Sequence, residues 1–208
     1  MLILGAGPLG QAALEIFQQN DMVVYGFLDD DTSLHSTTCQ HVPILGSTDD
    51  ATYLALLGKE CGAYVALDTM AQRKHIAAAL QAQYPLALVN AIHPRAQLAS
   101  SATAGHGNLI NAGATLGIHV SIGNHNTIHT HATLEQGATI DDHVEVGAGS
   151  VVGAGVTIHR EAFIGPGATI IGGVEIGAGA SVGAGAVVLA SVPAGTAVLG
   201  NPAQPVQR

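Results

Sequence analysis

The chain has 208 residues, which is enough for one or two domains with a substantial core. Its net charge of −9, with only six lysines and arginines, argues against nucleic acid and anionic membrane surfaces as partners. No stretch approaches the ~20 uninterrupted apolar residues of a membrane span, and the first residues lack the basic segment of a signal peptide. Cys39 and Cys61 lack the spacing of metal ligands, so we expect a cytoplasmic protein.

The first thirty residues have the pattern of a dinucleotide-type unit. Residues 2–4 predict a strand, Gly5-Ala6-Gly7-Pro8-Leu9-Gly10 a turn, and a helix follows through about Gln19. A second apolar run over residues 22–28 ends in Asp29-Asp30-Asp31. Such a turn lets a phosphate approach the start of a helix, and acidic residues at this distance face ribose or base hydroxyls. The alternative is a plain connection from strand to helix.

Three further elements complete a small α/β domain. We expect a strand over residues 63–67, a helix over about 71–83 and a strand over 86–89. His93-Pro94 then leads into a different pattern, and proline disfavours continuation of the preceding structure. We therefore predict one domain over residues 1–92 and a second over residues 93–208.

The second domain repeats with a period of six. Glycine often follows the large apolar residue of each hexad, and a small residue stands four positions after it. This period is neither that of a helix nor that of an ordinary strand, and it predicts a parallel β-helix built from hexapeptides. One residue of each hexad is large and apolar, with one exception: Leu98, Ala104, Ile110, Leu116, Ile122, Ile128, Leu134, Ile140, Val146, Val152, Ile158, Ile164, Ile170, Ile176, Val182 and Val188.

The predicted β-helix is a triangular prism in which three hexads close a coil, so that equivalent residues of successive coils stack. Neighbouring coils are expected ~4.8 Å apart, the ordinary spacing of paired strands. Asn108 and Asn126 take the inward small position one coil apart, which predicts a short buried amide ladder. His125 and His143 are also one coil apart and should stack on one edge.

The uninterrupted repeat resembles the left-handed β-helix of the hexapeptide acyltransferases. The whole chain resembles one subgroup, the sugar O- and N-acetyltransferases of the sialic-acid and bacillosamine pathway type. The residues that carry this resemblance are the glycine turn, Phe27-Leu28-Asp29-Asp30, Arg73, His93-Pro94 and Gly200-Asn201-Pro202-Ala203. The resemblance implies a small N-terminal α/β domain of the Rossmann-like type, followed by a left-handed parallel β-helix of hexapeptide repeats. It also implies that the protein is a homotrimer.

The resemblance also implies acetyl transfer from acetyl-CoA to an amino group or hydroxyl of a nucleotide-linked or acidic sugar, in bacterial surface-glycan biosynthesis. The nucleotide-linked sugar would lie in the N-terminal domain, at Gly7, Pro8, Leu9, Asp29 and Asp30. Pro8 and Leu9 stand where the family prefers glycine and histidine, and Asp68 where it has glycine.

Acetyl-CoA lies between adjacent prisms in that family. In this chain the corresponding groove positions are the small, stacked residues Ala148, Pro166 and Ala184. Glu145 stands where the family has a histidine that meets acetyl-CoA. Arg160 is the one lysine or arginine between Arg95 and Arg208, so cations for the phosphates of CoA are scarce.

The catalytic positions of the family are changed in this sequence. The base falls at Gln136 and its acidic partner at Gly137, and glutamine cannot act as a base. His129 is the first candidate for a relocated base, and His131 should point the same way if the segment is extended. Glu135 is a candidate to orient one of these histidines.

Three alternatives remain at this stage. The histidines can be plain exposed turn residues, because most polar surface residues have no special role. They can bind zinc at a subunit interface, although no two are spaced along the chain like the paired histidine ligands of the γ-class carbonic anhydrases. The protein can also be a non-catalytic trimeric scaffold or sugar-binding module that has lost its transferase site.

Overall fold

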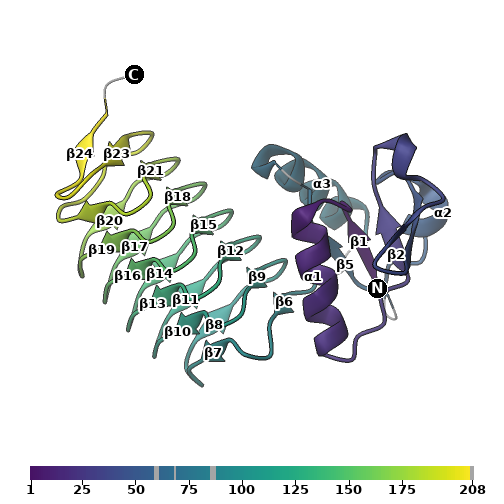
Figure 1. The fold of residues 1–208 in the computed structure, drawn as a ribbon, viewed down its shortest axis with the longest axis horizontal. Helices are drawn as coiled ribbons and strands as arrows, with labels where there is room; N and C mark the ends of the chain where they lie inside the picture. The colour runs from purple at the N-terminus through teal and green to yellow at the C-terminus, as the bar shows by residue number, and fades with distance from the viewer. Residues whose placement is uncertain (59–60, 68, 85–87, 207–208) are drawn as a thin grey trace. The chain divides into compact units, whose positions relative to one another are not determined.

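The computed structural model describes residues 1–58, 61–67, 69–84 and 88–206. The chain divides into two compact units, Met1–Pro94 and Arg95–Arg208. The first unit combines a sheet with helices, and the second is a column of stacked coils (Figure 1). No helix in the described residues is long and apolar enough to cross a bilayer.

The first unit is built on a five-stranded sheet with the order β3-β4-β2-β1-β5. Its central strands are parallel, and β3 pairs with β4 in the antiparallel sense. Residues of β1, β2 and β5 are buried, as expected for strands covered on both faces. The strands are β1 (Leu2–Leu4), β2 (Gly26–Leu28), β3 (Thr38–Cys39), β4 (Val42–Gly46) and β5 (Ala63–Val65), and a short β6 (Ala91–Ile92) follows.

Helices complete this unit: α1 (Pro8–Gln19), the 3₁₀ turn η1 (Thr32–Leu34), α2 (Ala51–Leu54) and α3 (Met70–Gln83). Thr69 and Gln72 form a capping box that fixes the start of α3. On α1, Phe17 packs edge-on against Tyr64 of β5 with 5.8 Å between ring centroids. The α1 helix is thereby fixed on the sheet, with its first turn close after the end of β1.

Three sequence predictions need correction in this unit. Of the apolar run over residues 22–28, only Gly26–Leu28 is a strand, because Val23 and Tyr25 are exposed rather than buried in the sheet. The strand predicted over residues 63–67 ends at Val65. Of the strand predicted over residues 86–89, residues 86 and 87 lie outside the described residues. Val89 belongs to no strand, although its N–H donates to the Ala63 carbonyl at 3.1 Å.

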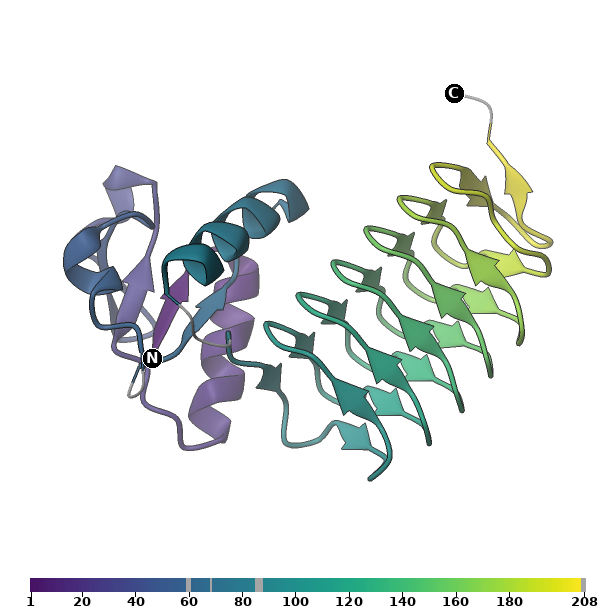
Figure 2. The same cartoon turned by 180° about the vertical axis from the view of Figure 1, so that it is seen from behind.

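The second unit consists of three sheets whose short strands stack coil upon coil (Figure 2). Paired strands from successive coils are parallel, for example Thr115 with Thr133, as the period predicts. The last strand, β24, pairs with β23 in the antiparallel sense.

Each sheet forms one side of the prism. The first contains β7 (Gln97–Leu98), β10 (Thr115–Leu116), β13 (Thr133–Leu134), β16 (Val151–Val152), β19 (Thr169–Ile170) and β22 (Val187–Val188). The second contains β8 (Thr103–Ala104), β11 (Ser121–Ile122), β14 (Thr139–Ile140), β17 (Thr157–Ile158) and β20 (Glu175–Ile176). The third contains β9 (Leu109–Ile110), β12 (Thr127–Ile128), β15 (Glu145–Val146), β18 (Phe163–Ile164), β21 (Ser181–Val182), β23 (Ala197–Leu199) and β24 (Gln204–Pro205).

The predicted amide ladder is present inside the prism. The Asn108 side chain is completely buried, and its Oδ1 accepts the Asn126 N–H at 2.8 Å. Its Nδ2 donates to the Gly123 carbonyl at 2.9 Å, and Asn126 Oδ1 accepts the Val144 N–H at 2.6 Å. These amides link three successive coils by hydrogen bonds in addition to the strand pairing.

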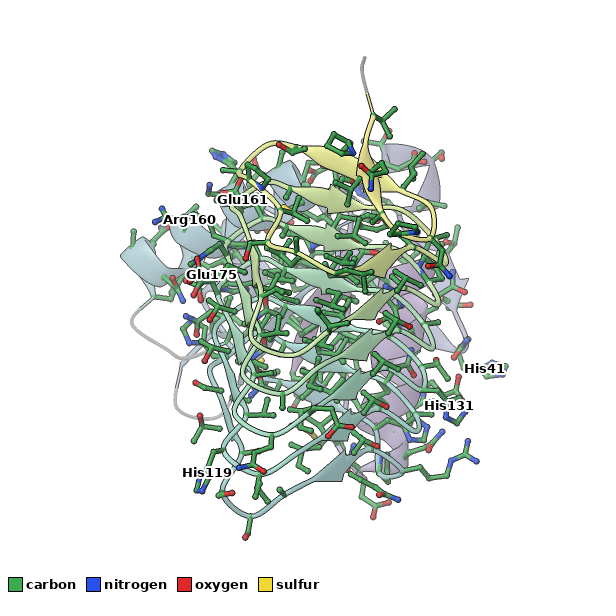
Figure 3. The ribbon with its side chains drawn as sticks, turned by 90° about the vertical axis from the view of Figure 1, so that its left-hand side faces the viewer. His41, His119, His131, Arg160, Glu161 and Glu175 are labelled. Carbon is green, nitrogen blue, oxygen red and sulfur yellow. The ribbon has the colours of Figure 1, made fainter. Side chains whose placement is uncertain are left out.

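The corner turns of the prism contain a residue with positive φ. In most hexads it is glycine, which adopts this conformation without the cost that a Cβ imposes. In five hexads the chain instead uses His119, His125, His131, His143 and Glu161, with φ between 57° and 61°. Figure 3 shows His119 and His131 at separate corners. Four histidines therefore occupy positions that glycine fills at lower energy.

We predict that His119→Gly stabilises the protein by about 0.5–1 kcal/mol, because relief of the positive φ exceeds the added freedom of the unfolded chain. His119 is exposed, and the Ser101 hydroxyl accepts its backbone N–H, which glycine retains. The matched control is Gly155→Ala at an equivalent corner, where an added Cβ meets no atom within 4 Å. Denaturant unfolding should show loss of stability for the control, and a destabilised His119→Gly variant would contradict the prediction.

Candidate active site

His129 and Glu145 form a hydrogen-bonded pair on the third side of the prism. His129 follows β12 and Glu145 begins β15 on the next coil, so parallel pairing brings the two side chains together. The His129 Nε2 lies 3.0 Å from Glu145 Oε1, and about a third of each side chain is exposed (34% and 32%). The backbone N–H of His129 donates to the Val146 carbonyl, which fixes its position. The pair is therefore oriented yet accessible to a ligand.

The carboxylate beside His129 is not Glu135, the candidate that the sequence offers to orient one of the histidines. Glu135 is exposed, and the structure pairs His129 with Glu145 instead. The family resemblance implies that Glu145 meets acetyl-CoA, and the structure adds its contact with His129. Glu145 follows His129 by slightly less than one coil, so the two side chains lie on adjacent coils. This spacing is the feature of the sequence from which their contact can be predicted.

His131 does not join this pair. The extended segment that its predicted direction requires is not present, because His131 has a φ of 57° and lies in a corner turn, where alternation along a strand does not apply. The ring instead packs over Gly113 of the preceding coil, where an added Cβ would touch the imidazole. Gln136 is exposed in the next corner, between β13 and β14, so one side of the prism separates it from His129.

The small groove residues form an exposed column at the corner after β15, β18 and β21. Ala148, Pro166 and Ala184 are exposed, and they occupy equivalent places on three successive coils. The Gly167 N–H donates to the Ala148 carbonyl and the Gly185 N–H to the Pro166 carbonyl, at 2.8 and 2.9 Å. This corner follows directly after the strand that begins with Glu145, so the His129–Glu145 pair and the column share one edge of the prism.

A second histidine–carboxylate cluster lies on another side of the prism and is absent from the sequence predictions. His159 Nδ1 lies 3.0 Å from Asp141 Oδ2, and its Nε2 lies 3.7 Å from Glu175 Oε2. His159 and Glu175 have the same spacing along the chain as His129 and Glu145, while Asp141 and His159 stand one full coil apart. The separation of these residues along the chain, close to one coil, is the feature of the sequence from which this cluster can be predicted.

Three other histidines, His106, His125 and His143, form a column along one corner. The rings of His125 and His143 stack with 5.0 Å between centroids, which confirms the predicted stacking. His106 meets His125 edge-on at 5.2 Å. Among the described residues, no group of three or more histidine, cysteine, aspartate or glutamate side chains is arranged to hold a metal ion.

Arg160 is exposed at a corner beside Glu161, on the same side of the view in Figure 3 as Glu175.

The first unit contains a cavity of about 190 Å³ at the ends of β1 and β2. Of the five residues predicted to bind substrate, Gly7, Asp29 and Asp30 line it, while Pro8 and Leu9 do not. The remaining described lining residues are Gly5, Asp31, Ala66, Leu67 and Gln72. The predicted contribution of Asp68 falls outside the described residues.

The acidic side chains of this cavity already hold backbone groups. Asp29 Oδ2 accepts the Ala6 N–H at 2.7 Å, and its Oδ1 accepts the Asp31 N–H at 2.9 Å. Asp30 Oδ1 accepts the N–H and the hydroxyl of Thr48. Hydrogen bonds from the Ser33 hydroxyl and N–H lower the pKa of Asp31 below its ordinary value. Asp31 is therefore charged at neutral pH.

Comparisons with known proteins agree with this architecture. The family model for the bacterial transferase hexapeptide (six repeats) matches residues 155–190. The acetyltransferase domain of PglB from Neisseria gonorrhoeae, in complex with acetyl coenzyme A, is 28% identical with a TM-score of 0.89. That match covers 99% of this chain and 98% of the other.

PerB from Caulobacter crescentus, in complex with CoA and GDP-perosamine, is also 28% identical with a TM-score of 0.89, over 99% of this chain and 96% of that one. WeeI from Acinetobacter baumannii shares the fold at 24% identity and a TM-score of 0.85, over 99% and 98% of the two chains. No curated protein matches the chain. The chain therefore has the left-handed β-helix of hexapeptide-repeat acyltransferases and resembles sugar acetyltransferases along its whole length.

Proposed function

We propose that this protein transfers the acetyl group of acetyl-CoA to the amino group of a nucleotide-linked sugar, with His129 as the general base. The observation that carries the proposal is the His129–Glu145 pair, at 3.0 Å, beside the exposed column of small residues. The complexes of PglB with acetyl coenzyme A and of PerB with CoA and GDP-perosamine support the two substrates.

The reaction needs a group that removes one proton from the attacking nitrogen. The amine forms a bond to the thioester carbonyl carbon, the carbon–sulfur bond breaks, and the CoA thiolate leaves as its thiol by taking up the proton that the base removed from the amine. In the neutral imidazole, Nε2–H donates a hydrogen bond to the Glu145 carboxylate, so Nδ1 of His129 carries the lone pair that receives the proton. Glu145 also stabilises the imidazolium that forms, as a carboxylate beside a cation does.

The exposed column would receive the pantetheine arm of acetyl-CoA. Ala148, Pro166 and Ala184 project little beyond the backbone, so an extended chain can lie along the corner. Arg160 is the one lysine or arginine of residues 96–206, and it sits beside Glu161, so the CoA phosphates would gain little from side-chain cations here. We expect backbone N–H groups to contribute more of that contact.

The first unit would be a Rossmann-like domain that holds the nucleotide-linked sugar in the cavity at Gly7, Asp29 and Asp30. We also propose a homotrimer in the cytoplasm, in which adjacent prisms form the groove for acetyl-CoA. Light scattering coupled to size exclusion tests the trimer directly, and a monomeric mass at working concentration would contradict it.

An acetyl-transfer assay tests the proposed activity. Purified protein is mixed with acetyl-CoA and a panel of nucleotide-linked amino sugars, while thiol release and product mass are followed over a pH series. We expect an acetylated product and a rate that rises with pH as the attacking amine loses its proton. Thiol release without an acetylated sugar would reject the acceptor class.

The competing function is a non-catalytic trimeric scaffold or sugar-binding module. The residues that favour it are Gln136 and Gly137, which occupy the family's base and acid positions. Under this function the protein binds neither acetyl-CoA nor CoA, whereas the transferase binds both.

A further inference from the structure

Phe163 is an exposed aromatic residue on the third side of the prism. It is the one phenylalanine, tyrosine or tryptophan that follows Tyr84 in the sequence. In its strand, β18, Ile164 is buried and points inward, while Phe163 points outward and is 37% exposed. The equivalent first residue of strands β10 to β22 is mostly threonine, serine or valine. Phe163 is therefore the largest side chain that projects outward from this side.

The strand register places Phe163 next to the candidate active site. Glu145 pairs with Thr127 on the preceding coil and with Phe163 on the following coil. Paired strands lie ~4.8 Å apart, so these two residues flank Glu145 at about that distance. The Phe163 N–H donates to the Ala180 carbonyl at 2.9 Å, which fixes its backbone. The aromatic ring is thereby held beside the carboxylate that bonds His129.

An acyl group that reacts beside the His129–Glu145 pair has limited room along this side of the prism. Thr127 is buried, with 5% of the residue exposed, so no open surface lies in that direction. In the other direction the ring of Phe163 stands beside Glu145, whose own side chain is 32% exposed. A methyl group fits between these two limits, whereas a longer chain has to displace the ring.

We propose that Phe163 restricts the acyl donor to short thioesters, because its ring fills the space that the third and fourth carbons of a longer acyl chain would occupy. The inference rests on the proposed function, which brings the thioester to the His129–Glu145 pair. An apolar wall favours contact with a methyl group through burial, and added volume against a fixed wall is tolerated poorly. Phe163 is thus a specificity-determining residue and takes no part in proton transfer.

Calorimetry with the full chain tests this selectivity, using CoA, acetyl-CoA, propionyl-CoA and butyryl-CoA. We expect the unaltered protein to bind butyryl-CoA at least about tenfold more weakly than acetyl-CoA, with propionyl-CoA between them. In Phe163→Ala the affinities for acetyl-CoA and butyryl-CoA should agree within about threefold, and the affinity for CoA, which has no acyl group, should change by less than about threefold. Equal binding of the two thioesters by the unaltered protein overturns the inference, as does a Phe163→Ala variant that retains the tenfold preference.

The matched control is Val151→Ala. Val151 has the same outward place in β16, on the first side of the prism, and is 38% exposed. This variant should keep the preference for acetyl-CoA. Phe163→Leu, which retains an apolar side chain without the ring, should show an intermediate preference. Light scattering on each variant measures its mass, and a Phe163→Ala variant that changes its oligomeric state but keeps the acyl preference would assign the ring to a subunit interface and overturn the inference.

The two proposals fail separately. If a nucleotide-linked sugar is acetylated but Phe163→Ala leaves the acyl preference unchanged, the proposed function stands and the inference falls. If Phe163→Ala gains affinity for butyryl-CoA but no acyl group reaches any sugar, the inference stands and the proposed function falls. Failure of all four ligands to bind rejects both proposals.

Discussion

Replacement of His129 by glutamine should lower kcat for acetyl transfer by about 10²–10⁴-fold, because glutamine cannot accept the proton of the attacking amine. Glutamine can still donate a hydrogen bond to Glu145, so the local structure is retained. Steady-state kinetics, with the product identified by mass, measures this loss.

The second cluster provides a matched control for this experiment. His159→Gln alters a histidine with the same spacing to its glutamate, on a different side of the prism. We expect its kcat and KM to match those of the unaltered protein. A full rate for His129→Gln, or an equal loss in both variants, would show that His129 is not the base.

Glu145 is expected to act through His129. Glu145→Gln should lower kcat by about 10–100-fold with KM nearly unchanged, since its carboxylate stabilises the imidazolium formed in the reaction. A change in KM alone would indicate a role in acetyl-CoA binding.

The largest effect on stability should come from Asn108→Ala, which we expect to destabilise the protein by about 2–4 kcal/mol. The change leaves the buried Asn126 N–H without its acceptor and deprives the Gly123 carbonyl of a donor, and it opens a cavity. Val120→Ala is the control at an equivalent, apolar inward position, and should cost about 1–2 kcal/mol. If denaturant unfolding shows equal losses of stability for the two variants, the amide ladder stabilises the protein only by filling space and not by its hydrogen bonds.

The β-helix can be predicted from the sequence because its period determines the register directly. Because one apolar residue returns every six positions, the position of each strand and of its pairing partner on the next coil can be predicted. The first unit carries weaker signals. Residues Val23 and Tyr25 are exposed although they belong to an apolar run, and β3 and β4 are short segments that the apolar pattern does not mark. Handedness comes from the resemblance, since a period of six serves either hand.

The site is harder to predict because its contacts join separate coils. The sequence marks His129 as a candidate, but its partner Glu145 lies on the next coil, while Glu135, which is closer along the chain, is exposed. The expectation for His131 assumes an extended segment. The structure has a positive φ there, and a histidine gives no sign of this in the sequence, whereas a glycine does. The structure brings His129, Glu145 and the column of small residues to one edge, while Gln136 lies elsewhere.

Titration of the purified protein with acetyl-CoA, and separately with CoA, is the most direct test of the transferase account. We predict binding with a Kd between about 1 μM and 1 mM, the range in which KM values for such substrates fall. Binding of both ligands would support a groove along the column of Ala148, Pro166 and Ala184. No heat of binding at millimolar ligand would contradict the account and leave the protein as a scaffold or sugar-binding module.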